Sequence, residues 1–135
     1  MKIIALDFGA RRIGLAIGDT DVGVAASRDF LTNDADTIEN ITELVERESI
    51  DKILIGLPRG LQHETAQTEV TRDFAKKLDA KVSIPLKFID ERFTSRIAEA
   101  NLQTAEINSR KQKSLVDSEA ARIILQEYLD ESEVT

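Results

Sequence analysis

Short apolar runs separated by turns constrain the fold of this sequence more than any other feature. Residues 2–7 contain an apolar run that ends in Asp7, which is typical of a buried strand. Residues 12–18 alternate between large apolar side chains and glycine or alanine, which predicts a second strand with one small face. That small face indicates close cover by another element, or a backbone that a ligand approaches. The short glycine-containing turn between the two runs predicts a β-hairpin.

The rest of the sequence predicts further strands and helices. In chain order these are a strand at 24–31, a helix from Asn33 or Asp34 to about Glu48, a strand at 53–55, a helix with Val70, Phe74 and Leu78 on its apolar face, a strand at 82–88, a helix from Thr94 or Ser95 to about Gln103, and a helix from about Ser114 to Leu129. Residues 59–65 and 104–113 are polar and predict loops. Pro85 predicts that the 82–88 strand lies at a sheet edge, because a missing N–H is tolerated there.

This order of elements predicts an α/β protein with a mixed five-stranded sheet and helices on its faces. The first three strands fit an antiparallel meander, whereas the fourth and fifth need helical crossovers and are expected to run parallel to the first. At 135 residues, with no internal repeat and no long linker, the chain is expected to form a single domain over residues 1–135.

Composition excludes several classes of function. The sequence has no cysteine, which excludes disulfides, thiol catalysis and cysteine-ligated zinc. It has no apolar stretch of about 18 residues that could span a membrane, and no signal-peptide pattern, so a cytoplasmic protein is expected. The single histidine, His63, has no Gly-x-Ser-x-Gly motif to accompany it, and the sequence has neither a Walker A loop nor a G-x-G-x-x-G fingerprint.

The net charge of −7 is concentrated in two segments. Residues 33–51 contribute −6 and residues 126–135 contribute −4, so the remainder of the chain carries +3. Contact with phosphates depends on local charge rather than on the total, and this distribution is compatible with a nucleic-acid partner.

Three acids occupy positions where local rules do not favour a carboxylate. Asp7 ends one apolar run, Glu91 follows another, and Asp117 shares the apolar face of the last predicted helix with Ala121 and Ile124. In sheets of this kind, ligands bind where the carboxyl ends of parallel strands meet, which would bring Asp7 and Glu91 together. Burial of Asp117 would cost several kcal/mol unless the carboxylate is paired or binds a metal.

Each of these acids also has a simpler interpretation. Asp7 fits a turn, Glu91 fits a surface ion pair with Arg92, and Asp117 fits the first turn of a helix, where the helix dipole favours an acid. Asp90 competes with Glu91, because alternation along the strand does not decide between the two.

Together the three acids predict a metal site. Clustered carboxylates repel each other unless a cation neutralises them. With no cysteine and hard oxygen ligands, the expected cation is Mg²⁺ or Mn²⁺. Two such ions about 4 Å apart can activate a water molecule and stabilise the leaving oxygen of a phosphodiester.

Basic residues near each acid predict contact with phosphate groups. The candidates are Arg11, Arg12, Arg92, Arg96 and Lys113. Aromatic residues make up only 4% of the chain and tryptophan is absent, which favours recognition of the nucleic-acid backbone over stacking on single-stranded bases.

Four short motifs occur in order along the chain. They are Ala5-Leu6-Asp7-Phe8-Gly9-Ala10-Arg11-Arg12-Ile13-Gly14-Leu15-Ala16, Gly56-Leu57-Pro58, Asp90-Glu91-Arg92-Phe93-Thr94-Ser95, and Val116-Asp117-Ser118 followed by Ala120-Ala121. Each motif is short, but the combination is specific and covers essentially the whole chain. It resembles the YqgF-type Holliday-junction-resolvase family, whose members are also described as pre-16S rRNA nucleases.

The resemblance implies a ribonuclease-H-like fold in which Asp7, Glu91 and Asp117 are the metal-binding catalytic acids. It favours Glu91 over Asp90. It also implies metal-dependent cleavage of phosphodiester bonds, in processing the 5′ end of pre-16S rRNA during ribosome biogenesis. Resolution of Holliday junctions is the older assignment for such proteins.

The sequence departs from the family pattern at two places. In the loop at residues 59–64, His63 stands where a glycine is usual, and Ala120 stands where junction resolvases carry a second acid. The changed loop and the acidic total charge favour a second hypothesis, a non-catalytic RNA-binding module of ribosome assembly. A third, a fragment-like ATPase of the actin type, is suggested by Asp7-Phe8-Gly9 and the hairpin that follows it, but 135 residues leave no room for the second domain that such proteins need. The expected assembly is a monomer or a weak homodimer. A junction resolvase would need the dimer, because it must cut two symmetric strands.

Overall fold

The computed structural model describes residues 1–57, 66–90 and 109–134, and within the last helix it describes the side chains of residues 118–131. The elements, in chain order, are β1 (Lys2–Phe8), β2 (Arg12–Asp19), β3 (Val24–Thr32), α1 (Thr37–Arg47), β4 (Lys52–Leu57), α2 (Ala66–Asp79), β5 (Leu86–Asp90) and α4 (Ser109–Val134). No helix in these ranges is both long enough and apolar enough to cross a membrane. The predicted helix from Thr94 or Ser95 to Gln103 lies outside the described residues.

The five strands form one mixed sheet in the order β3-β2-β1-β4-β5. β1 and β3 both pair antiparallel with β2, whereas β4 pairs parallel with β1 and with β5. The predicted antiparallel meander and the predicted parallel fourth and fifth strands are therefore confirmed.

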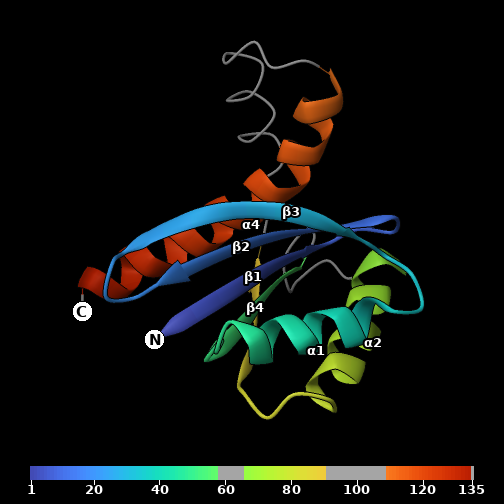
Figure 1. Cartoon of the computed structure of the whole chain (residues 1–135), viewed down its shortest axis with the longest axis horizontal. Coiled ribbons are helices and arrows are strands. Elements are labelled where there is room, and N and C mark those ends of the chain that lie inside the picture. The colour runs from blue at the N-terminus through green and yellow to red at the C-terminus, as the bar shows by residue number, and fades with distance from the viewer. Residues whose placement is uncertain (58–65, 91–108, 135) are drawn as a thin grey trace.

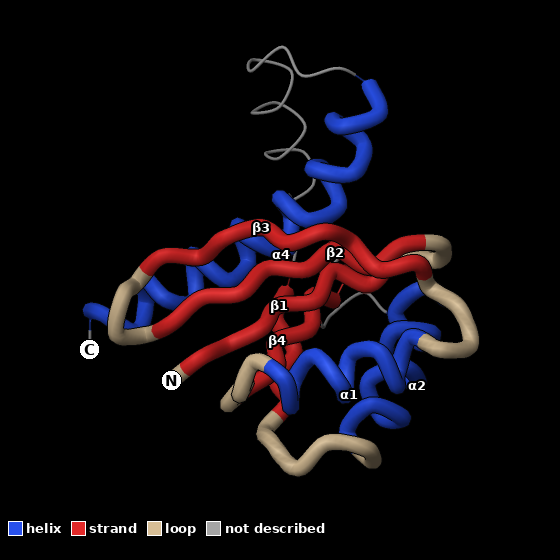
Figure 2. Tube along the Cα trace, in the orientation of Figure 1, coloured by secondary structure: helices blue, strands red, loops and turns tan. Residues whose placement is uncertain are grey.

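Helices cover both faces of this sheet. α1 and α2 lie against one face and α4 lies against the other (Figure 1, Figure 2). The core between the sheet and α1 and α2 is built from large side chains, which include Ile4, Leu6, Ile13, Ile53, Ile55, Ile41, Phe74 and Leu78. The opposite core, beneath α4, contains Ile3, Ala5, Ala16, Ala25, Leu54, Ala121, Leu125 and Leu129. Alternation along each strand assigns the large and small residues to these two cores.

The small face of β2 exists because α4 packs closely upon it. A β-carbon added at Gly18 would lie only 3.0 Å from Leu129 Cδ1 and 3.2 Å from Leu125 Cδ2. Ala16 on the same face is fully buried against the helix side of the sheet. Cover by another element, one of the two predicted explanations, therefore applies to this part of β2.

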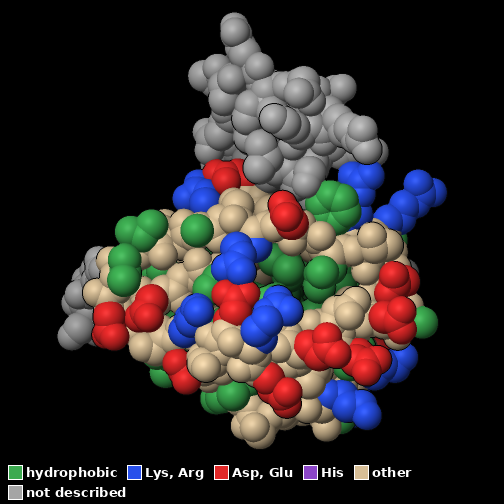
Figure 3. Space-filling model, viewed as in Figure 1, with side chains coloured by type: hydrophobic (Ala, Val, Ile, Leu, Met, Phe, Trp, Pro, Cys, Tyr) green, Lys and Arg blue, Asp and Glu red, His purple; other side chains and the backbone are tan. Residues whose placement is uncertain are grey.

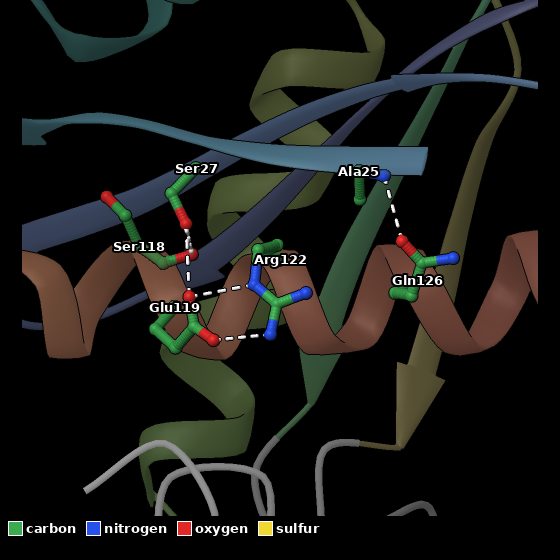
Figure 4. Close-up of polar contacts among 6 residues, drawn as sticks. All are labelled: Ala25, Ser27, Ser118, Glu119, Arg122 and Gln126. Atoms are coloured by element: carbon green, nitrogen blue, oxygen red, sulfur yellow. Dashed lines mark hydrogen bonds and ion pairs between the residues drawn. The ribbon is translucent and has the colours of Figure 1, made fainter. Parts of the chain in front are cut away.

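Polar contacts fix α4 along the outer strand β3 (Figure 4). The Gln126 side chain accepts a hydrogen bond from the Ala25 N–H at 2.9 Å and donates one to the Gly23 carbonyl at 2.9 Å. Two turns earlier, the Ser118 hydroxyl donates to the Arg28 carbonyl. The helix therefore runs in the same direction as β2 and opposite to β1 and β3, because residues 118 and 126 meet β3 in reverse order.

Glu119 and Arg122 strengthen the same part of the interface. The Ser27 hydroxyl donates to Glu119 Oε2 at 3.3 Å, and the Arg122 guanidinium donates to both oxygens of that carboxylate. These hydrogen bonds to Glu119 raise the pKa of the Arg122 guanidinium above its ordinary value. The pair adds a charged network to the small-residue packing beneath it.

The predicted fifth strand at 82–88 is wrong in its position. β5 spans Leu86–Asp90, and residues Val82 and Ile84 precede it as partly buried side chains packed on the core. The Pro85 carbonyl accepts a hydrogen bond from Ile53 N at 2.9 Å, so pairing begins at proline although proline itself cannot donate. β5 is nevertheless an edge strand, as predicted.

Three predicted helix details are also wrong. The first helix begins at Thr37 with Asp36 at its N-cap position, so neither Asn33 nor Asp34 caps it. Val70 of α2 is 50% exposed, and the buried stripe runs through Thr71, Phe74 and Leu78 instead. The last helix begins at Ser109 rather than near Ser114, so residues 109–113 are helical and not a loop. Arg, Lys and Gln are good helix formers, although they give no apolar periodicity.

Candidate metal and nucleic-acid site

Asp7 lies near the carboxyl end of β1 and is half-buried. It pairs with Gly14 of β2 on one side and with Gly56 of β4 on the other. Alternation places Asp7 on the same face as Ile3 and Ala5, which is the face that α4 covers. The carboxylate therefore has residues without side chains on both neighbouring strands.

The turn that follows Asp7 is tightly closed. A β-carbon added at Gly9 would lie 2.5 Å from the backbone oxygen of Arg12, closer than real contacts allow. Asn33 ties this turn to the end of β3, because its side-chain amide donates to the Gly9 carbonyl at 2.8 Å and its backbone N–H donates to the Arg11 carbonyl at 2.8 Å. The sequence indicated Asn33 only as a possible helix cap, so its role in positioning this turn was missed.

The register of the sheet shows which residues of β4 and β5 lie level with Asp7. Gly56 pairs with both Asp7 and Ile89, so these three residues form one row on the face that α4 covers. Ile89 packs on the α4-side core, whereas Phe88 packs on the α1 and α2 side. Position 90, at the end of β5, therefore belongs to the face opposite Asp7.

The other two predicted acids are less fully described. Glu91 lies outside the described residues, and Asp117 lies within α4 in the part whose side chains are not described. The first turns of α4, coloured orange, project away from the sheet, and the described packing of α4 on the strands begins at Ser118 (Figure 1). Within the described residues, no group of three His, Cys, Asp or Glu side chains comes together.

Two of the five predicted phosphate-binding residues belong to the turn after Asp7 and to the start of β2. Arg11 is exposed in the β1–β2 turn, and Arg12 is half-buried with its guanidinium carbon 5.0 Å from the centre of the Phe30 ring. Lys113 lies in α4 with its side chain undescribed, and Arg92 and Arg96 are outside the described ranges.

The face formed by β3, β2 and α1 carries basic and acidic side chains next to each other (Figure 3). Glu48 binds Arg28 at 2.6 Å and lies 3.7 Å from the Lys2 ammonium group. Partial burial raises the pKa of Glu48, but the hydrogen bond from Arg28 and the charges of Arg28, Lys2 and Arg47 outweigh it and leave the pKa below its ordinary value. This network joins β1, β3 and the end of α1 on the side of the sheet away from Asp7.

The mixed sheet in the order β3-β2-β1-β4-β5, with helices on both faces, defines a protein of the ribonuclease-H-like fold class. Two solved structures share this fold with TM-scores of 0.60. T. thermophilus RuvC in complex with a Holliday junction substrate is 11% identical, and the match covers 98% of this chain and 96% of that one. The fowlpox virus Holliday junction resolvase is 12% identical, with 98% and 99% covered.

The chain belongs to the RuvX family, described as Holliday junction resolvase, whose model matches residues 1–131. A protein of Maridesulfovibrio salexigens named "Putative pre-16S rRNA nuclease" is 40% identical over 133 residues, which cover 96% of this chain and 98% of the relative. A protein of Dictyoglomus thermophilum with the same name is 36% identical over 135 residues, with 98% and 97% covered. The family resemblance inferred from the four motifs is confirmed, and the class of chemistry in this family is hydrolysis of phosphodiester bonds.

Proposed function

We propose that this protein is a divalent-metal-dependent endonuclease that cleaves structured RNA, and that it processes the 5′ end of pre-16S rRNA in the cytoplasm. The substrate follows from the names of relatives that match nearly the whole chain at 36–40% identity. The observation in this molecule that supports nuclease chemistry is Asp7, an acid at the end of the central strand with a glycine on each neighbouring strand.

The surroundings of Asp7 fit a hard divalent cation. Gly14 and Gly56 leave the space beside the carboxylate free of side chains from the paired strands, and the chain has no cysteine to favour a softer metal. Oxygen ligands of this kind suit Mg²⁺ or Mn²⁺. We propose Asp7, Glu91 and Asp117 as the residues that hold the metal, with two ions as the expected number.

The direction of α4 supports the assignment of Asp117. Ala121 and Ala5 belong to the same core cluster, and α4 runs opposite to β1. Position 117 is one turn before Ala121, about 6 Å along the helix. Asp7 is two residues beyond Ala5, about 7 Å along the strand in the same direction. Position 117 is therefore expected beside Asp7.

The alternation of β5 supports Glu91 over Asp90. Ile89 shares its row and face with Asp7, and position 90 belongs to the opposite face. A residue that continued this alternation after Asp90 would return to the face of Asp7. The register thus gives a physical reason for Glu91 that the sequence did not supply.

In this proposal each residue has a distinct role in cleavage. Asp7, at the end of the central strand, would be shared by the two ions, and Glu91 and Asp117 would each bind one. When bound, the cations activate the attacking water and stabilise the leaving oxygen. Arg11, Arg12, Arg92, Arg96 and Lys113 hold the phosphates that flank the scissile bond.

We propose a monomer or a weak homodimer as the working assembly. Gln126 accepts a hydrogen bond from the Ala25 N–H and Ser118 donates one to the Arg28 carbonyl, so α4 engages backbone groups of β3, an edge strand of the sheet. A second copy could not pair with those groups without displacing α4. Strand pairing through this part of β3 is therefore disfavoured as a dimer contact.

The test is a cleavage panel with purified protein, a pre-16S rRNA fragment and a four-way DNA junction, each with Mg²⁺ and with Mn²⁺. We expect cleavage of the RNA by the wild type, loss of cleavage in Asp7→Asn without loss of folding, and full activity in the matched control Asp29→Asn on exposed β3. Full activity of Asp7→Asn would refute the site. Cleavage of the junction alone would show that the substrate is DNA. RNA binding that is unchanged by a chelator, together with no cleavage, would indicate a non-catalytic binding module.

A further inference from the structure

Two lysines share one aromatic ring on the α4 side of the sheet. The Lys52 ammonium group lies 5.0 Å from the centre of the Tyr128 ring and donates a hydrogen bond to the Tyr128 hydroxyl at 2.7 Å. The Lys87 ammonium group lies 5.5 Å from the centre of the same ring. The three residues come from β4, α4 and β5, so the fold rather than the local sequence brings them together.

These two cations have no carboxylate partner in the described part of the chain. The ion pairs there are made by other residues, although the chain contains 25 acids against 18 lysines and arginines. Two positive charges held near one ring repel each other, and an anion between or beside them would remove that repulsion. The ring also restricts the lysine side chains, which lowers the entropy lost when they bind a ligand.

The position of this pair relates it to Asp7. Lys52 and Gly56 lie on the same face of β4, and Lys87 and Ile89 lie on the same face of β5. Gly56 and Ile89 belong to the row of Asp7, on the face that α4 covers. Lys52 precedes Gly56 by four residues, which is about 13 Å along the strand. That distance equals the axial rise of roughly four nucleotides in one strand of a duplex.

We propose that Lys52 and Lys87, positioned by Tyr128, form a phosphate-binding site for the nucleic-acid backbone, about four nucleotides from the bond that is cleaved. This inference rests on the proposed function for the identity of its ligand. The site recognises the charge and the spacing of the phosphates. It does not discriminate between base sequences, because it contacts only phosphate. It holds the substrate in register with the Asp7 row, so its loss weakens binding rather than the chemical step.

The test measures binding of a labelled pre-16S rRNA fragment as a function of salt, in the Asp7→Asn background so that the RNA remains intact. We expect the double variant Lys52→Gln/Lys87→Gln to lower the slope of log affinity against log salt by about 2, roughly one for each phosphate contact. The matched control Lys76→Gln/Lys77→Gln makes the same charge change on exposed α2, across the sheet, and should leave the slope unchanged. An equal loss of slope in the two double variants would overturn the site.

A second variant separates charge from packing. Lys52→Arg/Lys87→Arg keeps both charges and should keep the salt slope, whereas loss of slope in this folded variant would show that the lysines act only through packing. In cleavage assays with otherwise wild-type protein, the glutamine variant should raise KM and leave kcat nearly unchanged. If the wild type cleaves RNA and the glutamine variant has the same KM and the same salt slope, this site is refuted and the nuclease assignment stands. A wild type that binds RNA through these lysines but never cleaves it would refute the nuclease alone, and a wild type that binds no nucleic acid would refute the site.

Discussion

Gly9→Ala should damage both the fold and the candidate site, because the turn after Asp7 has no room for a methyl group. The new β-carbon would lie 2.5 Å from the backbone oxygen of Arg12, against a lower limit of 3.0 Å for real contacts. The turn must open by about 0.5 Å, at a cost of about 1–3 kcal/mol. Loss of the hydrogen bond from Asn33 to the Gly9 carbonyl adds about 1 kcal/mol. The expected loss of unfolding free energy is therefore about 2–4 kcal/mol.

The activity of Gly9→Ala should fall further than its stability explains. Asp7 is two residues away, and a displacement of about 1 Å at a catalytic group can cost about 100-fold in rate, so we expect a loss of about tenfold or more in kcat. The matched control is Gly23→Ala in the β2–β3 turn at the other end of the sheet, where a φ of 78° should cost about 1–2 kcal/mol. Urea unfolding and RNA cleavage would be measured for both. Equal activity in the two variants would refute the reasoning.

Three further outcomes are expected. The stability difference between wild type and Glu48→Gln should be largest above the ordinary glutamate pKa of about 4.5, and it should vanish as the pH falls through the lowered pKa of Glu48 in the folded protein. Urea unfolding from about pH 7 to pH 3 would measure this, and a constant difference would contradict the ion-pair network. Leu125→Ala should lose about 2–5 kcal/mol in the same assay, because the Leu125 side chain of α4 is fully buried against the sheet; a loss below about 1 kcal/mol would contradict that packing. Mn²⁺ at about 100 times its Kd should stabilise the wild type by about 2.7 kcal/mol in thermal unfolding and leave Asp7→Asn unchanged; equal stabilisation would place the metal elsewhere.

The sequence predicted those parts of the fold that depend on local periodicity. Alternation in residues 12–18 and the apolar run before Asp7 gave the hairpin, and the helical crossovers gave the parallel strands. The prediction failed where a single residue changed the pairing, as at Pro85, and where good helix formers lacked an apolar face, as at residues 109–113. The exposed Val70 shows that spacing alone cannot choose between two overlapping apolar stripes.

For the candidate site, the sequence could propose residues but could not describe their surroundings. Asp7 was proposed from its place after an apolar run. The pairing of Asp7 with Gly14 and Gly56 depends on the register of two different strands, which no local pattern specifies. The same holds for Lys52 and Tyr128, which are 76 positions apart in sequence.

The packing of α4 has a consequence for the order in which the protein matures. Its hydrogen bonds with β3 and with the turn before β3 join residues 90 to 103 positions apart, and α4 follows every other described element in the chain. During synthesis, the strands that carry Asp7 emerge long before the helix that covers them. A nascent chain would therefore expose the alanine- and glycine-rich side of its sheet and lack position 117. Nuclease activity should therefore arise only after α4 has been synthesised and has docked on the sheet.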